Sequence, residues 1–206
     1  MDTIEFARLR ELVAASRTYR RFDEARPVPR ELLEALVGVA RLAPTGNNTQ
    51  TLRFHLSTEP GEVAAVLSHH RWAGLLADWD GPEEGARPTA YVTVLGPAGA
   101  RKNAIRNQDA GIAAQTLALA ARAAGLGCCM VASFDAHLME AIGLAGRADE
   151  LEPLVILALG WPAADETVVL EPADTSHGLA YWRERDALTG VWTHHVPKLA
   201  LEELLV

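Results

Sequence analysis

Apolar and polar residues follow two different periods along this chain, and the periods predict both helices and strands. Residues 29–43 carry leucine, valine and alanine at helical spacing, with one proline near the first turn and another just past the end. Residues 52–56 alternate apolar and polar side chains, as a half-buried strand does, whereas 89–95 and 154–160 are the apolar runs of more deeply buried strands. We therefore expect a mixed sheet flanked by helices.

A further stretch, residues 109–127, has alanine and leucine on almost every helical face. Such a helix must be buried on nearly all sides, either in the core or against another subunit. We favour a homodimer interface over a wholly internal position, because small alanine side chains permit close helix approach. Gly125 and Gly127 are expected to end this helix before a buried strand at 128–134.

Two segments lack such periodicity. Residues 79–88 are rich in glycine and proline, and residues 161–206 alternate turn-forming and aromatic residues. We expect both to be surface excursions from one globular domain that spans residues 1–206, because a chain of this length can bury a sizeable core as one unit.

Composition narrows the possible partners. The formal net charge is -8 and 49% of the residues are hydrophobic. Nucleic acid and anionic membranes need a broad basic face, so neither is an expected partner. We expect a cytoplasmic protein, since no long uncharged apolar run or leader-like segment is present and the adjacent cysteines Cys128 and Cys129 favour a reducing compartment. Both cysteines are predicted to be structural.

Several common catalytic patterns are missing from the sequence. It contains no G-x-x-x-x-G-K-[ST] loop and no G-x-S-x-G elbow. The pairs His69–His70 and His194–His195 do not predict a metal site, because adjacent side chains point in different directions in regular structure. No metal is therefore expected.

Two polar motifs carry the chemistry that remains. S-R-T-Y-R-R-F at 16–22 concentrates positive charge in an acidic chain, and A-P-T-G-N-N-T-Q at 43–50 follows it after one predicted helix. Guanidinium groups and backbone N–H donors are suited to a phosphate. The two motifs together predict a site for a phosphorylated ligand.

The order and spacing of these motifs resemble the nitroreductase family, whose opening pattern is R-R-S-x-R-x-F followed by A-P-S-x-x-N-x-Q-P-W. The segments at 72–88 and 194–198, and A-A-G-L-G at 123–127, are similar to a bacterial subgroup of that family. The resemblance covers nearly the whole chain. It implies an α+β, nitroreductase-like fold with a mixed central sheet flanked by helices in an intertwined homodimer.

The resemblance also implies FMN as cofactor and NADH or NADPH as electron donor, with hydride passing through flavin N5 to an electron-poor quinone or nitroaromatic acceptor. The flavin would carry the chemistry, so no catalytic side chain is expected. Three residues match family positions that hold the FMN phosphate and the polar flavin edge: Arg17, Thr18 and Arg20. Lys198 matches a C-terminal basic residue that reaches the phosphate. The loop that the partner subunit lays against the flavin ring is matched by Pro44, Thr45, Gly46 and Asn48, with Gln50 in support. The strand end whose N–H faces flavin N5 is matched by Ala132 and Ser133.

Some positions depart from the family pattern. Ser16 replaces the first arginine, Q-T-L at 50–52 replaces Q-P-W, and Leu199 stands where a second basic residue is common. These departures predict weaker binding of the FMN phosphate than in other members of the family. Arg21 and Arg106 are expected to be solvated surface charges, although either could compensate, and Asp109 is expected to be a helix N-terminal cap or dipole partner.

Two other functions remain open. The chain could be an FMN-binding store or sensor without significant turnover, which would share every flavin-site residue. It could also be a flavin-independent binding module for another phosphate, which would leave the motif at 43–50 and an interface helix without a role. The physiological acceptor and the choice between NADH and NADPH do not follow from the sequence.

Overall fold

The main sheet contains four strands in the order β1-β2-β4-β3, and each neighbouring pair is antiparallel. The computed structural model describes residues 3–76, 79–174 and 176–206. The strands are β1 (Arg53–Ser57), β2 (Ala90–Pro97), β3 (Gly127–Val131) and β4 (Leu151–Gly160). β2 and β4 occupy the centre, which explains why their sequences are nearly continuous apolar runs.

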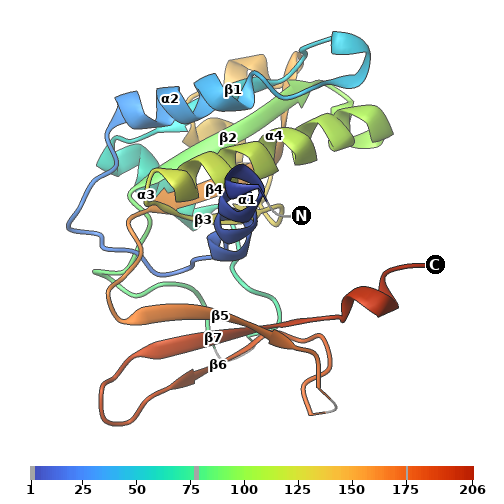
Figure 1. Ribbon diagram of the computed structural model, residues 1–206. Coiled ribbons are helices and arrows are strands. Elements are labelled where there is room, and N and C mark those ends of the chain that lie inside the picture. Colours follow the sequence, from blue (N-terminus) through green and yellow to red (C-terminus); the bar gives the residue numbers. More distant parts are fainter. Residues whose placement is uncertain (1–2, 77–78, 175) are drawn as a thin grey trace.

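Helices cover both faces of this sheet (Figure 1). They are α1 (Ile4–Ala15), α2 (Arg30–Ala40), α3 (Pro60–Ser68), α4 (Ala104–Ala123) and α5 (Leu138–Ala141). Successive residues of β2 point to opposite faces, so Val92 packs with α2 and α4 while Tyr91 packs with α3 and α5. The α+β class predicted from the sequence is confirmed.

A second sheet lies apart from the first in the C-terminal region (Figure 1). Its strands are β5 (Glu166–Pro172), β6 (Trp182–Arg185) and β7 (Trp192–Lys198), in the order β5-β7-β6. β5 and β7 are parallel and β6 and β7 antiparallel, so among the named strands the parallel pair lies here, while the main sheet has an isolated parallel bridge between Thr18 and Cys128 of β3. The expectation that 161–206 forms only turns and surface excursions is wrong, because pairing between distant segments creates these strands.

Most of the other predicted elements are present with shifted ends. The helix expected at 29–43 is α2, and the helix expected at 109–127 is α4, which begins at Ala104. Gly125 adopts a positive φ of 86° directly after α4, as its role in ending the helix requires. The described part of 79–88 contains no helix or strand, while residues 77 and 78 of the motif at 72–88 lie outside the described residues.

Apolar side chains remain exposed on α1 and on one side of α4. Ile4, Phe6 and Leu9 of α1 are 68%, 53% and 52% exposed, and none of the residues of α1 is buried. On α4, Ala113 and Leu117 lie in the core, whereas Ile105 and Ile112 are exposed. α4 is therefore only half covered by its own chain.

Candidate functional site

The arginine-rich segment crosses the ends of β3 and β4. Tyr19 donates its backbone N–H to the carbonyl of Cys128 at 3.0 Å, and Phe22 pairs with Pro162. Gly127 and Gly160 lie opposite each other in the sheet, and a Cβ on either would come within 3.0 Å of a side chain of this segment. Because both positions lack a side chain, the segment can lie directly on the sheet. This contact fixes the backbone from which the arginine side chains project.

Arg17 and Arg20 each present a buried nitrogen that lacks a hydrogen-bond partner, the Nε atom. Arg17 donates from a terminal nitrogen to the carbonyl of Val13 at 2.6 Å, and burial lowers the pKa of its guanidinium. Arg20 lies with its guanidinium carbon 4.7 Å from the ring centre of Tyr181. Unpartnered buried donors are costly, so this pair of arginines is suited to receive an anion.

Arg21 has a different role from its two neighbours. It is 7% exposed and donates to the carboxylates of Glu83 and Asp165 at 2.6 and 2.7 Å. Although burial opposes the charge, these hydrogen bonds raise the pKa of Arg21 overall. The expectation of a solvated surface charge is wrong here, because two carboxylates from distant loops enclose the guanidinium.

A buried acid and a buried imidazole lie behind the arginine segment. Glu166 accepts the backbone N–H of Arg20 at 3.3 Å, and its other oxygen lies 3.7 Å from Nε2 of His194. Burial raises the pKa of Glu166 to about 7 and lowers that of His194 to about 4, so both prefer the neutral form. Nothing in the sequence indicated a role for Glu166, and His194 stood out only as one of a histidine pair that does not predict a metal site.

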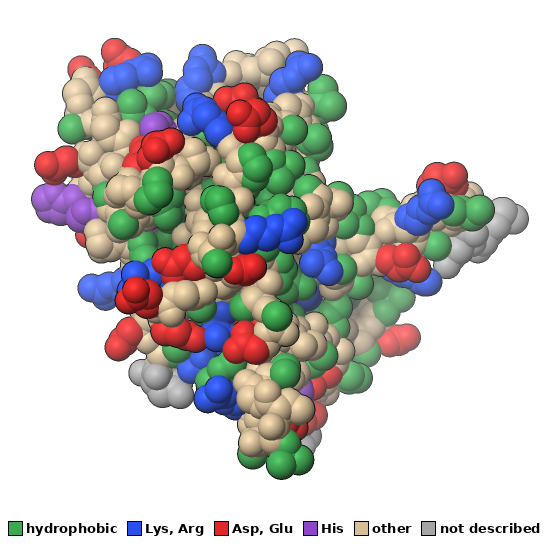
Figure 2. Space-filling view, turned by 90° about the vertical axis from the view of Figure 1, so that its left-hand side faces the viewer, with side chains coloured by type: hydrophobic (Ala, Val, Ile, Leu, Met, Phe, Trp, Pro, Cys, Tyr) green, Lys and Arg blue, Asp and Glu red, His purple; other side chains and the backbone are tan. Residues whose placement is uncertain are grey.

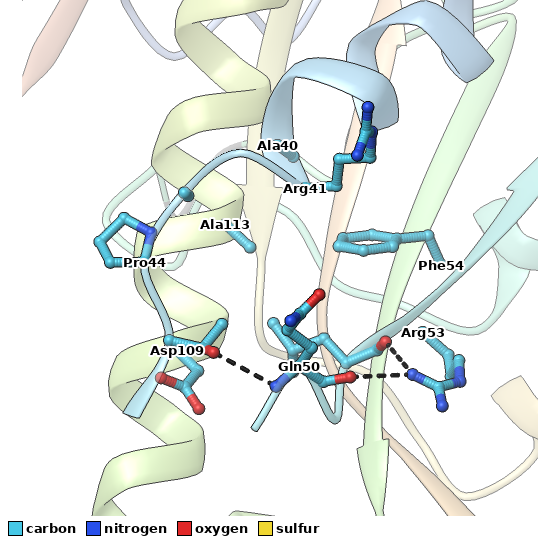
Figure 3. Close-up of a pocket in the computed structure, with 11 residues that line it drawn as sticks. Ala40, Arg41, Pro44, Gln50, Arg53, Phe54, Asp109 and Ala113 are labelled. Atoms are coloured by element: carbon cyan, nitrogen blue, oxygen red, sulfur yellow. Dashed lines mark hydrogen bonds between the residues drawn. The ribbon is translucent and has the colours of Figure 1, made fainter. Parts of the chain in front are cut away.

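The loop at 43–50 has an unusual backbone conformation. Asn47, Asn48 and Gln50 have φ angles of 53°, 52° and 47°, in the left-handed region that non-glycine residues rarely occupy. Asp109 accepts the N–H of Gly46 at 2.7 Å. Arg53 donates to the carbonyl of Gln50 at 3.1 Å (Figure 3). The loop, α4 and β1 surround a cavity of about 190 Å³.

The contacts of Asp109 and Arg106 in the structure also differ from the roles expected from the sequence. The N-terminal cap of α4 is Asn103, whose side chain accepts the N–H groups of Ile105 and Arg106. Asp109 lies in the second turn, is 2% exposed and pairs with Arg106 at 3.0 Å. The prediction of a cap for Asp109 and of a solvated charge for Arg106 is therefore wrong, because the two side chains hold a loop from another part of the chain.

Ala132 and Ser133 directly follow β3 and are exposed. The carbonyl of Ser133 accepts the N–H of Arg71 at 2.8 Å, which fixes this backbone at the mouth of a polar cavity of about 380 Å³. His69 and Asp135, which face each other at 3.1 Å, also line that cavity. Ser133, just past the end of β3, thus lines open space.

The predicted site residues do not all meet within one chain. The loop at 43–50 is tied to Asp109, whereas Arg122 lies 5.6 Å from the ring centre of Tyr19, so about 20 Å of α4 separates the loop from the arginine segment. Exposed Lys198 pairs with Pro172 at the far end of β5, about 20 Å from Glu166 and Arg20. Arg17, Thr18 and Arg20 lie on one short segment, and neither the loop nor Lys198 lies near that segment in the same chain.

Three of the four paired histidines, His69, His70 and His195, form hydrogen bonds within the protein. His70 bonds the hydroxyl of Tyr91 at 2.9 Å, and His195 bonds Glu171 at 2.8 Å. Among the described residues no group of three potential metal ligands was found, and no helix there is long and apolar enough to cross a membrane. On the face shown in Figure 2, acidic and basic side chains are interspersed with hydrophobic ones.

Comparisons with known proteins bear on the family and the fold. Residues 13–161 match the model of the nitroreductase family, a range that includes every predicted site residue except Lys198. No curated protein matches the chain.

Solved structures of this family have a similar fold. A nitroreductase family protein from Streptococcus pneumoniae is 17% identical with a TM-score of 0.62, over 81% of this chain and 94% of that one. One from Clostridium difficile is 24% identical with a TM-score of 0.57, over 79% and 86%. An FMN complex from Desulfovibrio desulfuricans, assigned as a nitroreductase, is 22% identical with a TM-score of 0.61, over 79% and 88%.

Proposed function

Because this chain belongs to the nitroreductase family, we propose that it is an FMN-dependent oxidoreductase that passes hydride from NADH or NADPH to an electron-poor acceptor of the quinone or nitroaromatic type. Structurally similar proteins from Desulfovibrio desulfuricans and Exiguobacterium sibiricum are in complex with FMN, which supports this cofactor. The oxidoreductase class follows from the family, whereas the cofactor, donor and acceptor are parts of the proposal.

The observation that carries the proposal is the pair of buried, unpartnered Nε atoms on Arg17 and Arg20. A phosphate monoester near neutral pH is close to a dianion and accepts several charge-assisted hydrogen bonds. Two guanidinium donors on the segment that pairs with the start of β3 fit such a group, and the hydroxyl of exposed Thr18 lies between them in the sequence. The residues present therefore fit the phosphate of FMN.

A second copy of the chain would complete the site. The loop at 43–50 lies about 20 Å from the arginine segment in its own chain, so it would serve the site of the partner. The exposed apolar side chains of α1 and α4, such as Phe6 and Ile112, supply surface that a partner subunit would cover. We therefore include a homodimer with interfacial sites in the proposal.

When bound, FMN supplies hydride transfer through its N5 atom. The chain would contribute binding and electrostatics. Arg17 and Arg20 would neutralise the phosphate and the polar edge of the ring, and the backbone at Ala132 and Ser133 would offer an N–H donor beside the open cavity. No described side chain need act as a nucleophile.

An absorption spectrum of the purified protein, with and without added FMN, tests the cofactor. We expect flavin bands that are retained through gel filtration, and a protein that takes up no FMN would refute the proposal. Arg20→Ala should weaken FMN binding at least about tenfold, since a charge-assisted hydrogen bond is lost. Arg147→Ala is the matched control, because Arg147 forms only an exposed ion pair with Glu150.

Turnover separates an enzyme from a flavin store or sensor. Under anaerobic conditions, NADH or NADPH should bleach the bound flavin, and a quinone or nitroaromatic compound should restore its colour. A flavin that stays oxidised with both donors would contradict an oxidoreductase and favour storage or sensing. Steady-state rates with a panel of acceptors would then identify the preferred class.

A further inference from the structure

The loop at 43–50 is held in a conformation that its own residues do not favour. Asn47, Asn48 and Gln50 all have positive φ angles. Each such residue costs on the order of 1 kcal/mol or more, so the conformation persists only if its surroundings impose it. The loop therefore depends on specific contacts with the rest of the chain.

Side-chain packing between the loop and α4 is incomplete and does not by itself impose this conformation. Pro44, Thr45 and Gln50 line the cavity of about 190 Å³ between the loop and α4, so the loop lies over space on this side (Figure 3). Asn47, Asn48 and Gln50 are exposed on the outer side. Apart from the close approach of Gly46 to Ile105, polar contacts therefore hold the loop.

Asp109 provides the central contact. Its carboxylate is 2% exposed, and one oxygen accepts the N–H of Gly46 at 2.7 Å. The other oxygen accepts from Arg106 at 3.0 Å, and the same terminal nitrogen of Arg106 donates to the hydroxyl of Thr49. Asp109 and Arg106, both on α4, thus bind the loop at two residues, Gly46 and Thr49.

The fit at this contact excludes any side chain at position 46. A Cβ there would lie 2.3 Å from Cγ2 of Ile105, so only glycine lets the backbone come close enough to Asp109. At the other end, Thr45 accepts the N–H of Gln50 at 3.2 Å, and Arg53 donates to the carbonyl of Gln50. Asp109 is the member of this set that joins the loop to α4 through a buried charge.

We propose that Asp109 is a positioning residue that holds the loop at 43–50 in the shape needed to complete the FMN site of the partner subunit. This inference rests on the proposed function, and it adds a residue that touches neither cofactor nor acceptor. Arg106 assists by neutralising the buried carboxylate and by holding Thr49. Loss of the Asp109 carboxylate should therefore release the loop while α4 and the sheet stay folded.

FMN titration and hydrogen exchange of the Asp109→Ala protein test whether Asp109 holds the loop at 43–50 in the shape that FMN binding needs. We expect FMN binding to weaken at least about tenfold, as for loss of a charge-assisted contact, and exchange to accelerate in a peptide covering 43–52 but not in one covering 113–121. Asp109→Asn, which keeps an oxygen acceptor for Gly46, should restore part of the affinity. Val66→Ala, a core truncation on the opposite face of the sheet, controls for general loss of stability.

Mixed dimers test whether the effect crosses the interface. In a dimer of one Arg20→Ala chain and one Asp109→Ala chain, one site combines the intact Arg20 of one chain with the intact loop of the other. We expect one FMN to bind each mixed dimer with wild-type affinity, although both parent homodimers bind weakly. If no site of the mixed dimer binds FMN with wild-type affinity, the proposal that Asp109 acts on the FMN site of the partner subunit is refuted.

The outcomes separate this inference from the proposed function. A wild-type protein that takes up no FMN refutes the function, and the hydrogen-exchange comparison still tests whether Asp109 holds the loop. Wild-type protein that binds FMN, together with Asp109→Ala protein that binds it equally well, refutes the role of Asp109 and leaves the function standing.

Discussion

Replacing Glu166 by glutamine isolates the energetic effect of one buried carboxyl group. Its side chain is 0% exposed, one oxygen accepts the N–H of Arg20 at 3.3 Å, and the other has no hydrogen-bond partner. Glutamine has nearly the same shape and can accept the same bond through its amide oxygen. The substitution therefore removes the ionisable group and preserves the contact.

The pKa of Glu166 sets the magnitude and the sign. Burial raises it from 4.5 to about 7, while Arg20 and Arg21 partly oppose the shift. The folded protein then binds the proton more tightly than the unfolded chain, so the contribution to stability is full below about pH 4.5 and is lost as pH rises through about 7. A shift of this size corresponds to at most about 3 kcal/mol.

The ionisation of His194 changes the stability of the protein with pH in the opposite direction, over a similar pH range. Burial lowers its pKa from 6.5 to about 4, so its contribution is present above about pH 6.5 and is lost as pH falls through about 4. Arg20, Arg21, Arg183 and His195 also disfavour its charged form. Since His194 is present in both proteins, comparing Glu166→Gln with the wild type at each pH largely removes its own contribution.

Urea unfolding at a series of pH values measures the difference. We expect Glu166→Gln and the wild type to be nearly equally stable at about pH 4, and the variant to be more stable by up to about 3 kcal/mol at about pH 8. Glu202→Gln, at an exposed position, should show no such trend. A Glu166→Gln protein that is less stable than the wild type at about pH 8 would refute the reasoning, since the carboxylate would then be a stabilising charge.

Three further predictions follow from other contacts. Gly160→Ala should lower the free energy of unfolding by about 1–3 kcal/mol, because its Cβ would meet Phe22 at 2.8 Å. Arg21→Met should lower it by a similar amount, about 1–3 kcal/mol, because two carboxylates lose their buried partner. Cys128 and Cys129 should resist a thiol reagent at about pH 8 until urea is added, because burial raises both pKa values, that of Cys129 to about 11.

Each of these has a simple control. Gly146→Ala should be harmless, since nothing lies within 4 Å of the added Cβ, and a loss equal to that of Gly160→Ala would contradict the steric argument. Arg147→Met removes an exposed ion pair and should change stability by less than about 1 kcal/mol. Rapid modification of either cysteine in the folded protein would show that the strand is accessible.

Local hydrophobic patterns were sufficient to predict the central elements. β2 and β4 have apolar runs long enough to predict buried strands, and α2 has a clear apolar face. The strands β5, β6 and β7 could not be predicted in this way. Their sequences mix charged and aromatic residues, and pairing between segments 26 residues apart, such as Glu166 with Trp192, defines them.

The candidate site shows the same limit for individual side chains. Arg17, Arg20 and Arg21 are neighbours of one type, yet Arg21 is buried between Glu83 and Asp165 while the other two keep unpartnered Nε atoms. Nothing in the local sequence distinguishes them, because the carboxylates come from loops 62 and 144 residues away. The buried position of Asp109 was missed for a similar reason, since its partner Gly46 lies 63 residues away.

The attachment of residues 20–22 to the last third of the chain has a consequence for biosynthesis. Arg20 pairs with Glu166, Arg21 with Asp165, and Phe22 with Pro162. A ribosome releases the arginine segment early and these partners at least 140 residues later. Glu83 and Cys128, which also contact the segment, emerge earlier, so the segment acquires its contacts in stages and the full set can form only after residue 166 has been synthesised.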